Sequence, residues 1–217
     1  MAEIKNLKKR YGDRTVLDIP SLIFRSGETA ALAGANGSGK TTLLKILAGL
    51  IKPDEGEINA PQSKLYMPQQ SYAFRGDLVR NILICGGEKS EALSLLDKLG
   101  LAHLAGKKAK SLSGGELQRL SLCRVLSKEC DLLLLDEPTS ACDAAGAELV
   151  TKMIAEYKEK TGCTVIMSTH SPALAVNAAD RLIILGDGVI EADGAPGDIL
   201  SNPSTHWAES FRAGWKI

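Results

Sequence analysis

The sequence has no long uninterrupted apolar run and no excess of charge of either sign. The longest apolar stretches, Ala30 to Ala35 and Leu132 to Leu135, are far shorter than the roughly 18 residues that a membrane-spanning helix needs. We therefore predict that the chain does not cross a bilayer. Lys and Arg together number 26, as do Asp and Glu, which gives a formal net charge of zero. Because a broad basic field is missing, we expect no nucleic-acid partner.

Clustered metal-binding residues and a secretion signal are also missing. The chain has five cysteines, an odd number without a C-x-x-C pair, and three histidines. This pattern predicts free thiols, as in a reducing compartment, rather than a zinc site or a disulfide framework. The N-terminal residues MAEIKN lack an apolar segment with a cleavage site, so we expect a cytoplasmic protein.

Short apolar runs alternate with helical patterns along the chain. Runs of this length, bounded by turn residues, are typical of buried strands, and five segments fit: 17–24, 29–33, 132–135, 164–167 and 182–185. Apolar residues at helical spacing follow Lys40 as far as Pro53, and again lie between Asp143 and Tyr157. We expect an α/β fold with a parallel sheet flanked by helices and an antiparallel β part at the N-terminus.

One segment in the middle of the chain has a helical pattern only. From about Gly76 to Lys110 no strand pattern occurs, and one apolar face is expected from Leu93, Leu96 and Leu99. With 44% hydrophobic residues the chain can bury the core of one ordinary domain. We therefore expect a single domain over residues 1–217, with a small helical subdomain inserted at about residues 76–125.

A glycine-rich turn connects the expected strand 29–33 to the expected helix. Residues 34–41 (GANGSGKT) match the phosphate-binding pattern G-x-x-x-x-G-K-[ST]. Glycines allow successive backbone N–H groups to face a polyphosphate, and the helix N-terminus adds a favourable dipole. We expect Lys40 to contact the β- and γ-phosphates and Thr41 to ligate Mg²⁺. The expected nucleotide-binding residues of this loop are Gly34, Ala35, Asn36, Gly37, Ser38, Gly39, Lys40, Thr41 and Thr42.

Two acidic residues follow the apolar run 132–135. Asp136 and Glu137 come at the carboxyl end of a buried strand, where open α/β sheets bind their ligands. Two carboxylates at one place need a compensating cation, which a Mg-nucleotide bound by the phosphate loop would supply. We predict that Asp136 holds the metal's coordination shell and that Glu137 polarises the attacking water. The alternative is that the two acidic residues merely end a strand at the surface. A phosphate loop in the same chain disfavours this alternative.

A second glycine-bearing helix start lies at residues 112–118 (LSGGELQ). Ser113 is a candidate N-cap whose hydroxyl, with the N–H groups that follow, can bind a γ-phosphate, and Glu116 completes a capping box. The string LSGGE resembles the signature of ATP-binding cassette (ABC) ATPases, and the resemblance runs from about residue 2 to 215. It implies that Ser113, Gly114 and Gly115 bind the ATP held by a second copy, so that two cassettes close head to tail over two nucleotides.

The resemblance also assigns roles around the nucleotide. Tyr11 occupies the place of the aromatic residue that stacks on adenine, and Val16 that of an aliphatic side chain beside the base and sugar. Gln69 matches the glutamine that reaches Mg²⁺ and the attacking water, while Gln70 is the weaker match. His170 matches the switch histidine, which contacts the γ-phosphate and aligns the catalytic carboxylate; an incidental histidine after a strand is the alternative.

Residues 140–143 (SACD) match the D-loop of the family, which adds Asp143 to the expected nucleotide-binding residues. This segment departs from the family at Cys142, where leucine is usual. Both side chains are apolar and similar enough to pack, so we expect function to survive. The thiol leaves redox sensitivity open.

The resemblance implies an ATP-hydrolysing, energy-coupling subunit of a membrane ABC transporter, and we favour a prokaryotic small-solute importer. Because the chain has no membrane segment of its own, we expect membrane permease subunits as partners and a peripheral location at the inner face of the cell membrane. An importer would add an extracytoplasmic solute-binding protein. Residues 74–81 are similar both to oxyanion importers of the tungstate type and to multidrug exporters, so they do not decide the direction. Candidates for the permease contact, or alternatively for subdomain core, are Tyr72, Phe74 and Leu78.

Two other classes stay open. The first is an ABC ATPase that acts on nucleic acid or ribosomes; such relatives carry long insertions or a second cassette, and here the spacing from Gln69 to Ser113 is short. The second is a cassette that drives a non-transport membrane machine. Near the C-terminus Trp207, Phe211 and Trp215 recur every four residues and predict a helix that packs on the core or forms a dimer contact.

Overall fold

The computed structural model describes residues 1–213, which form two compact units. The first unit comprises Met1–Tyr66, Asp131–Glu137 and residues 162–213, and the second comprises Met67–Cys130 and Pro138–Thr161. Within the described residues no helix is both long and apolar enough to span a membrane. Each of the five cysteines is a free thiol.

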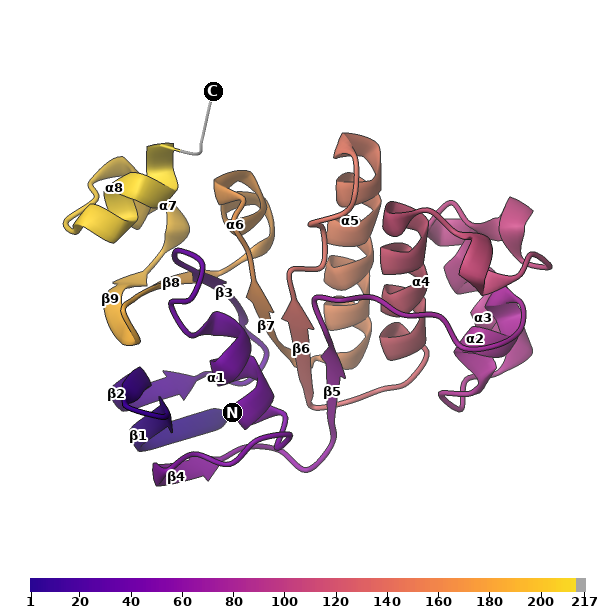
Figure 1. The fold of residues 1–217 in the computed structure, drawn as a ribbon. Coiled ribbons are helices and arrows are strands. Elements are labelled where there is room, and N and C mark those ends of the chain that lie inside the picture. Colours follow the sequence, from indigo (N-terminus) through magenta and orange to yellow (C-terminus); the bar gives the residue numbers. More distant parts are fainter. Residues whose placement is uncertain (214–217) are drawn as a thin grey trace. The chain divides into compact units, whose positions relative to one another are not determined.

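A six-stranded sheet forms the centre of the first unit, with the strand order β5-β6-β7-β3-β8-β9 (Figure 1). The neighbours β6 and β7, β7 and β3, and β3 and β8 are parallel, whereas β9 pairs antiparallel with β8. Every residue of β3, β6 and β7 is buried, as the apolar runs predict. The bounds are β3 Thr29–Ala33, β5 Lys64–Met67, β6 Leu132–Asp136, β7 Thr164–Ser168, β8 Arg181–Gly186 and β9 Val189–Gly194.

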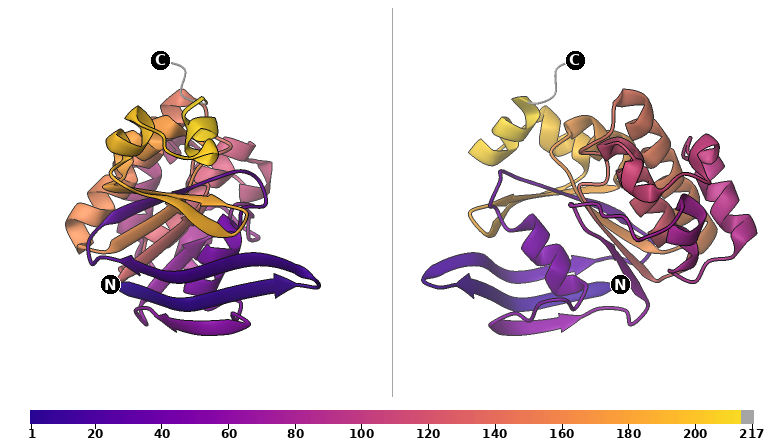
Figure 2. Two further views of the ribbon diagram at one scale, coloured as in Figure 1. Left: turned by 90° about the vertical axis from the view of Figure 1, so that its left-hand side faces the viewer. Right: turned by 45° about the vertical axis from the view of Figure 1, so that its right-hand side comes forward.

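A separate three-stranded antiparallel sheet belongs to the same unit. Its strand order is β2-β1-β4, and Figure 2 shows the three strands side by side in both views. The strands are β1 Ala2–Tyr11, β2 Arg14–Phe24 and β4 Glu55–Asn59. This sheet is the expected antiparallel β part at the N-terminus, so the predicted α/β fold is confirmed in both of its parts.

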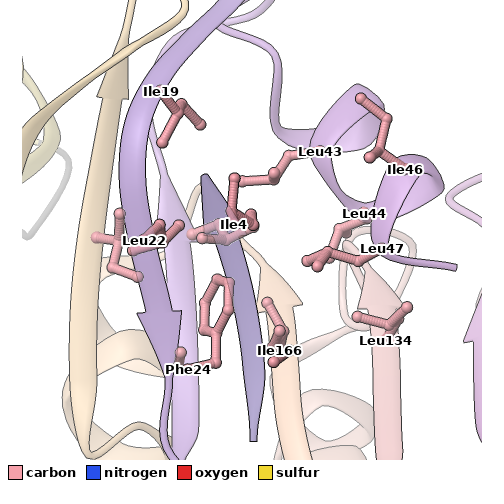
Figure 3. Close-up of a cluster of buried hydrophobic side chains, with 14 of the residues drawn as sticks. Ile4, Ile19, Leu22, Phe24, Leu43, Leu44, Ile46, Leu47, Leu134 and Ile166 are labelled. Atoms are coloured by element: carbon pink, nitrogen blue, oxygen red, sulfur yellow. The ribbon is translucent and has the colours of Figure 1, made fainter. Parts of the chain in front are cut away.

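Helix α1 (Lys40–Leu47) lies between the two sheets and joins their cores. Its buried side chains Leu43, Leu44 and Leu47 face Ile4 and Phe24 of the antiparallel sheet, and Leu134 and Ile166 of the central sheet (Figure 3). The remaining helices of the unit are α6 Pro172–Ala178, α7 Pro196–Ser201 and α8 His206–Ala213. Because α1 begins at the phosphate loop, this shared core fixes the loop at the carboxyl end of β3.

Replacing Phe24 with alanine is expected to lower the free energy of unfolding by about 3–5 kcal/mol. The ring is fully buried in the core, next to Ile166 of the central sheet (Figure 3), and its removal leaves a cavity that the rigid strands cannot close. Urea denaturation followed by circular dichroism measures the change. The matched control is Ile23→Ala, because Ile23 precedes Phe24 on the same strand and is 43% exposed. Equal losses from both substitutions would contradict this core.

The second unit is helical. It contains α2 Leu78–Leu83, α3 Lys89–Lys98, α4 Gly114–Leu126 and α5 Ala144–Thr161, with short 3₁₀ turns at Ala102–Leu104 and Ala109–Ser111. Polar caps start three of these helices: Asp77 accepts a hydrogen bond from the Arg80 N–H at 2.7 Å, Ser113 caps α4, and Asp143 caps α5. That the two units act as one domain, with the helices as an inserted subdomain at about residues 76–125, stays a prediction.

Three details differ from the sequence-based expectations. Helix α1 ends at Leu47, before Pro53, because Gly49 takes a left-handed φ of 76° and its N–H bonds to the Ile46 carbonyl. On α3 the buried residues are Ala92, Leu95 and Leu96, and Leu99 at the end of the helix is also buried, so Leu96 and Leu99 are confirmed and only the exposed Leu93 is wrong. Leu78 is fully buried, so its interpretation as core holds and that as a permease contact is wrong.

The C-terminal helix α8 buries Ala208 and Phe211 and only part of Trp207. Both α7 and α8 contact β8 and β9, which favours packing on the core for this end of the apolar stripe. Trp215 lies outside the described residues.

Candidate active site

The predicted phosphate loop connects β3 to α1 in the first unit, as the sequence indicates. The Lys40 side chain is buried, and its ammonium donates hydrogen bonds to the carbonyls of Gly34 (2.8 Å) and Ala35 (3.0 Å). Burial lowers the pKa of Lys40, while the carboxylates of Glu137 and Asp136 act in the opposite direction. The loop therefore wraps around a desolvated cation, which is the arrangement that a phosphate anion would complete.

The backbone of the loop depends on its glycines. Gly34, Gly37 and Gly39 have φ values of 140°, 81° and 104°, which side chains rarely permit. A Cβ on Gly39 would also lie only 2.8 Å from the Val16 carbonyl oxygen, because the loop packs directly on β2. These constraints fix the backbone path of the loop into the start of α1.

A buried hydroxyl in the loop supports the fit of a phosphate. Among the described residues, Ser38 Oγ has no hydrogen-bond partner, although the residue is only 3% exposed. The first N–H groups of α1 also have no acceptor within the helix, as at every helix start. An orphaned donor, free N–H groups and a buried ammonium together suit a polyphosphate.

Asp136, at the end of β6, is the centre of a hydrogen-bond cluster. Its Oδ1 accepts hydrogen bonds from Thr41 Oγ1 (3.1 Å) and from Ser168 Oγ (2.6 Å), and its Oδ2 accepts one from the Tyr66 hydroxyl (3.2 Å). The carboxylate is 1% exposed. Burial and the Asp136 charge raise the pKa of Tyr66, so the phenol stays a donor. The structure therefore brings together the two residues of the first unit expected to ligate Mg²⁺, Thr41 and Asp136.

The donor set suits a metal that is shared with a substrate. Within residues 1–213 no group of three or more His, Cys, Asp and Glu side chains is placed to hold a metal ion. Mg²⁺ prefers oxygen ligands and is usually bound by one or two carboxylates together with substrate phosphates. A hydroxyl and a carboxylate beside a phosphate loop fit that pattern.

Glu137 and His170 form a pair next to this cluster. His170 Nε2 lies 2.8 Å from Glu137 Oε1, although 33 residues separate them in the chain. Glu137 is a non-glycine residue with a positive φ of 51°, and its N–H donates to Ser168 Oγ at 2.9 Å. Such backbone strain is found where function requires an unusual orientation. The strand-to-loop turn thus aims the carboxylate at the histidine.

Tyr11 and Val16 lie at the turn between β1 and β2. Tyr11 is 54% exposed, with the Lys9 ammonium 5.4 Å from the centre of its ring. An exposed ring is free to stack on a base. The Val16 backbone contacts the loop at Gly39, so this edge adjoins the phosphate loop. Their roles toward a base and a sugar stay predictions.

The remaining predicted residues belong to the second unit. Ser113 caps α4 in a capping box: the Glu116 N–H bonds to Ser113 Oγ at 3.4 Å, and the Ser113 N–H bonds to Glu116 Oε2 at 2.7 Å. The backbone and side-chain hydrogen bonds from Ser113 hold the pKa of Glu116 below its ordinary value. The predicted N-cap and capping box are confirmed.

Asp143 in this unit caps α5, because its Oδ1 accepts from the Gly146 N–H at 2.9 Å. Burial raises the pKa of the Cys142 thiol, which favours the protonated form over the reactive thiolate. Gln69 follows β5 in the second unit. The expected reach of Gln69 to a metal, and the phosphate contacts of Ser113, Gly114, Gly115 and Asp143, stay predictions.

A family model described as ABC transporter matches residues 17–140, more than half of the chain. This match spans the phosphate loop, the signature turn and both acidic residues. The chain belongs to the ABC transporter family. As an ABC cassette it binds nucleotide and hydrolyses ATP.

Curated relatives agree with this assignment. The tungstate uptake system ATP-binding protein TupC of Peptoclostridium acidaminophilum is 36% identical over 208 residues, which cover 88% of this chain and 97% of the relative. An aliphatic sulfonates import ATP-binding protein of Streptomyces avermitilis is 40% identical over 191 residues, covering 86% and 74%. A zinc import ATP-binding protein of Roseobacter denitrificans is 35% identical and covers 94% and 82%.

Solved structures match the ABC cassette as a whole. One is a dimeric ATP-binding cassette in a post-hydrolysis state with ADP and phosphate; it has a TM-score of 0.81 and 27% identity, and the match covers 90% of this chain and 99% of that chain. Another is a putative metal-chelate type ABC transporter in an inward-facing conformation, with a TM-score of 0.79 and 30% identity over 92% and 84% of the chains.

Sequence reasoning missed two residues of this ABC cassette that hold Asp136. Ser168 pairs with Asp136 in the parallel register of β6 and β7, so a polar residue at the end of each strand was the available signal. Tyr66 gave no local signal, because its position beside Asp136 depends on β5 and β6 being neighbours.

Proposed function

We propose that this ABC cassette is the energy-coupling subunit of a prokaryotic importer of a small solute. The names of its relatives support import, and they differ in the solute. The proposed partners are a second copy of the cassette, membrane permease subunits and an extracytoplasmic solute-binding protein. The proposed location is the cytoplasmic face of the cell membrane. The structural observation that carries the ATP-hydrolysing part of the proposal is the 2.8 Å pair of Glu137 and His170 beside Asp136.

The phosphate loop would hold the triphosphate. Lys40 and the N–H groups at the start of α1 would bind the β- and γ-phosphate oxygens, and Ser38 Oγ is an unused donor in the same loop. Thr41, Asp136 and Gln69 would hold Mg²⁺. When bound, the metal would neutralise charge that develops on the phosphates. Tyr11 and Val16 would contact the base and the sugar.

Glu137 would act on the attacking water. As the water oxygen bonds to the γ-phosphorus and the bond from that phosphorus to the bridging oxygen breaks, the water proton passes to the Glu137 carboxylate. The products are ADP and inorganic phosphate. His170 holds the carboxylate through the contact at Oε1. Its exposed side chain would contact the γ-phosphate and so report whether that group is attached.

The γ-phosphate would also join two copies. Ser113, Gly114 and Gly115 of each copy would bind the triphosphate held by the other, with Asp143 nearby. These contacts exist only while the γ-phosphate is attached, so its release removes the interaction that favours the closed dimer. The chemical cycle would thereby open and close the assembly that drives the permease.

Replacing His170 with alanine is expected to lower the turnover number for ATP by about 10- to 100-fold, the loss of one hydrogen bond to a charged group. The KM for MgATP should change little, because the phosphate loop is untouched. Steady-state phosphate release measures both quantities. His103→Ala is the matched control, since that histidine is exposed in the second unit. A His170 variant with full turnover would show that the pair does not orient Glu137.

Purification from native membranes tests the proposed assembly. A tagged full-length chain should co-purify with a multi-span permease, and ATP turnover of that complex should rise when the transported solute is supplied with its binding protein. A partner with few spans and a large extracytoplasmic domain would instead indicate a non-transport membrane machine. Recovery of ribosomes or nucleic acid, sensitive to nuclease, would contradict the transporter assignment.

A further inference from the structure

A buried amide on α4 binds the segment Ser140–Cys142 within the second unit. Gln118 is 1% exposed, and its Nε2 donates to Ser140 Oγ at 3.0 Å. Its Oε1 accepts from the Ala141 N–H at 2.8 Å and from Cys142 Sγ at 3.5 Å. The oxygen and the nitrogen of the Gln118 amide therefore both bind the same short loop.

A second contact joins the same loop to the start of the helix. A Cβ on Gly115 would lie 2.8 Å from the Ala141 carbonyl oxygen, and one on Gly114 would lie 3.8 Å from the Ala141 Cβ. The loop backbone thus packs against the two glycines that follow Ser113. Gln118 and the glycine turn hold Ala141 from two sides.

The far end of the loop is also fixed. The Cys142 N–H bonds to the Thr139 carbonyl at 3.1 Å, and the Asp143 carbonyl and carboxylate accept from the first turn of α5. The near end follows Glu137 and Pro138 directly in the chain. A displacement of the turn Ser113–Gly115 is therefore expected to displace the segment Ser140–Cys142 as well, because hydrogen bonds limit the movement of that segment.

We propose that Gln118 is a positioning residue that couples the turn Ser113–Gly115 to the segment leading from Glu137. The inference rests on the proposed function, in which that turn binds the γ-phosphate of a second copy. Gln118 contacts neither nucleotide nor metal in this scheme. It holds Ser140 and Ala141 so that closure at the turn is transmitted along residues 137–143 to the catalytic carboxylate.

Gln118→Met tests the coupling, because methionine keeps the length of the side chain and removes both hydrogen-bonding groups. We expect the turnover number of the full-length chain to fall by about tenfold or more, with the KM for MgATP within about twofold of the original. Ser140→Ala removes only one hydroxyl from an exposed residue, which secures a folded variant, and should lower turnover by about threefold. The two substitutions should be non-additive when combined, since they break one interaction.

Ser127→Ala is the matched control. Ser127 is also buried on the end of α4, and its hydroxyl donates to the Arg124 carbonyl at 2.9 Å, away from the loop. It should leave turnover unchanged even if it lowers the thermal midpoint as much as Gln118→Met does. An equal turnover loss in this control, or full turnover in both Gln118→Met and Ser140→Ala, would overturn the coupling. Turnover that survives Glu137→Gln would contradict the proposed function instead.

Discussion

Changing Glu137 to glutamine is expected to lower the turnover number for ATP by about 10²- to 10⁴-fold, the range that a general base contributes. The amide keeps the size of the side chain and its contact with His170, but it cannot take a proton from water. The affinity for MgATP should stay near the original value, because the phosphate loop and Asp136 are unchanged. Phosphate release under saturating MgATP measures the turnover.

The Glu137→Gln variant should also accumulate as a dimer, because the ATP that joins the two copies is no longer hydrolysed. Sedimentation velocity with and without MgATP measures this state. Glu57→Gln is the matched control: Glu57 is an exposed glutamate of the first unit, on β4. Unchanged turnover in the Glu137 variant would remove the residue from the role of base. A Glu137 variant that stays a single copy with MgATP, even with its membrane partners present, would contradict the head-to-tail assembly.

Replacing Lys40 with alanine is expected to weaken the binding of MgATP by about 100-fold. The ammonium is buried and held by the Gly34 and Ala35 carbonyls, so it is already placed and partly desolvated before a phosphate arrives. Its removal deletes the only charge of the phosphate loop 34–41 and leaves those carbonyls without their donor. Isothermal titration calorimetry with MgATP measures the loss.

Lys45→Ala provides the comparison for this binding experiment. Lys45 lies on the same helix, in its last turn, and is only half-buried. Its replacement removes the same charge without touching the loop, so the affinity should stay within about threefold. Similar losses from both substitutions would mean that a general positive field, and not the loop geometry, binds the nucleotide.

The parts of the site that depend on local sequence were predictable. The glycine spacing of residues 34–41 identifies the phosphate loop because each step of the loop needs a particular φ. The runs of β6 and β7 identify two buried strands because parallel strands are covered on both faces. The capping box at Ser113 is likewise a pattern within four residues, and the structure confirms it.

The parts that depend on pairing between distant segments were not predictable from local patterns. The family resemblance pointed to an alignment of His170 with Glu137, but their distance and the support from Ser168 follow from the parallel register of β6 and β7. Strand β1 escaped detection because its buried residues Ile4 and Leu7 are three positions apart, which breaks the alternation typical of a strand. The chain is irregular there: Asn6 has a positive φ of 50°, and a register shift interrupts the pairing of β1 with β4. The exposed face of α3 at Leu93 was misassigned because apolar spacing alone does not show which of two faces meets a neighbour.

In the capping box of α4, a carboxylate of the chain itself already occupies the hydrogen-bond donors at the start of the helix. The Glu116 carboxylate accepts both the Ser113 N–H and the Ser113 hydroxyl, and its lowered pKa keeps it ionised at neutral pH. In the proposed assembly an incoming triphosphate would compete with this carboxylate for the serine. Closure would then require the Ser113 donors to exchange the Glu116 carboxylate for a phosphate oxygen, which ties engagement of this turn to the presence of the γ-phosphate.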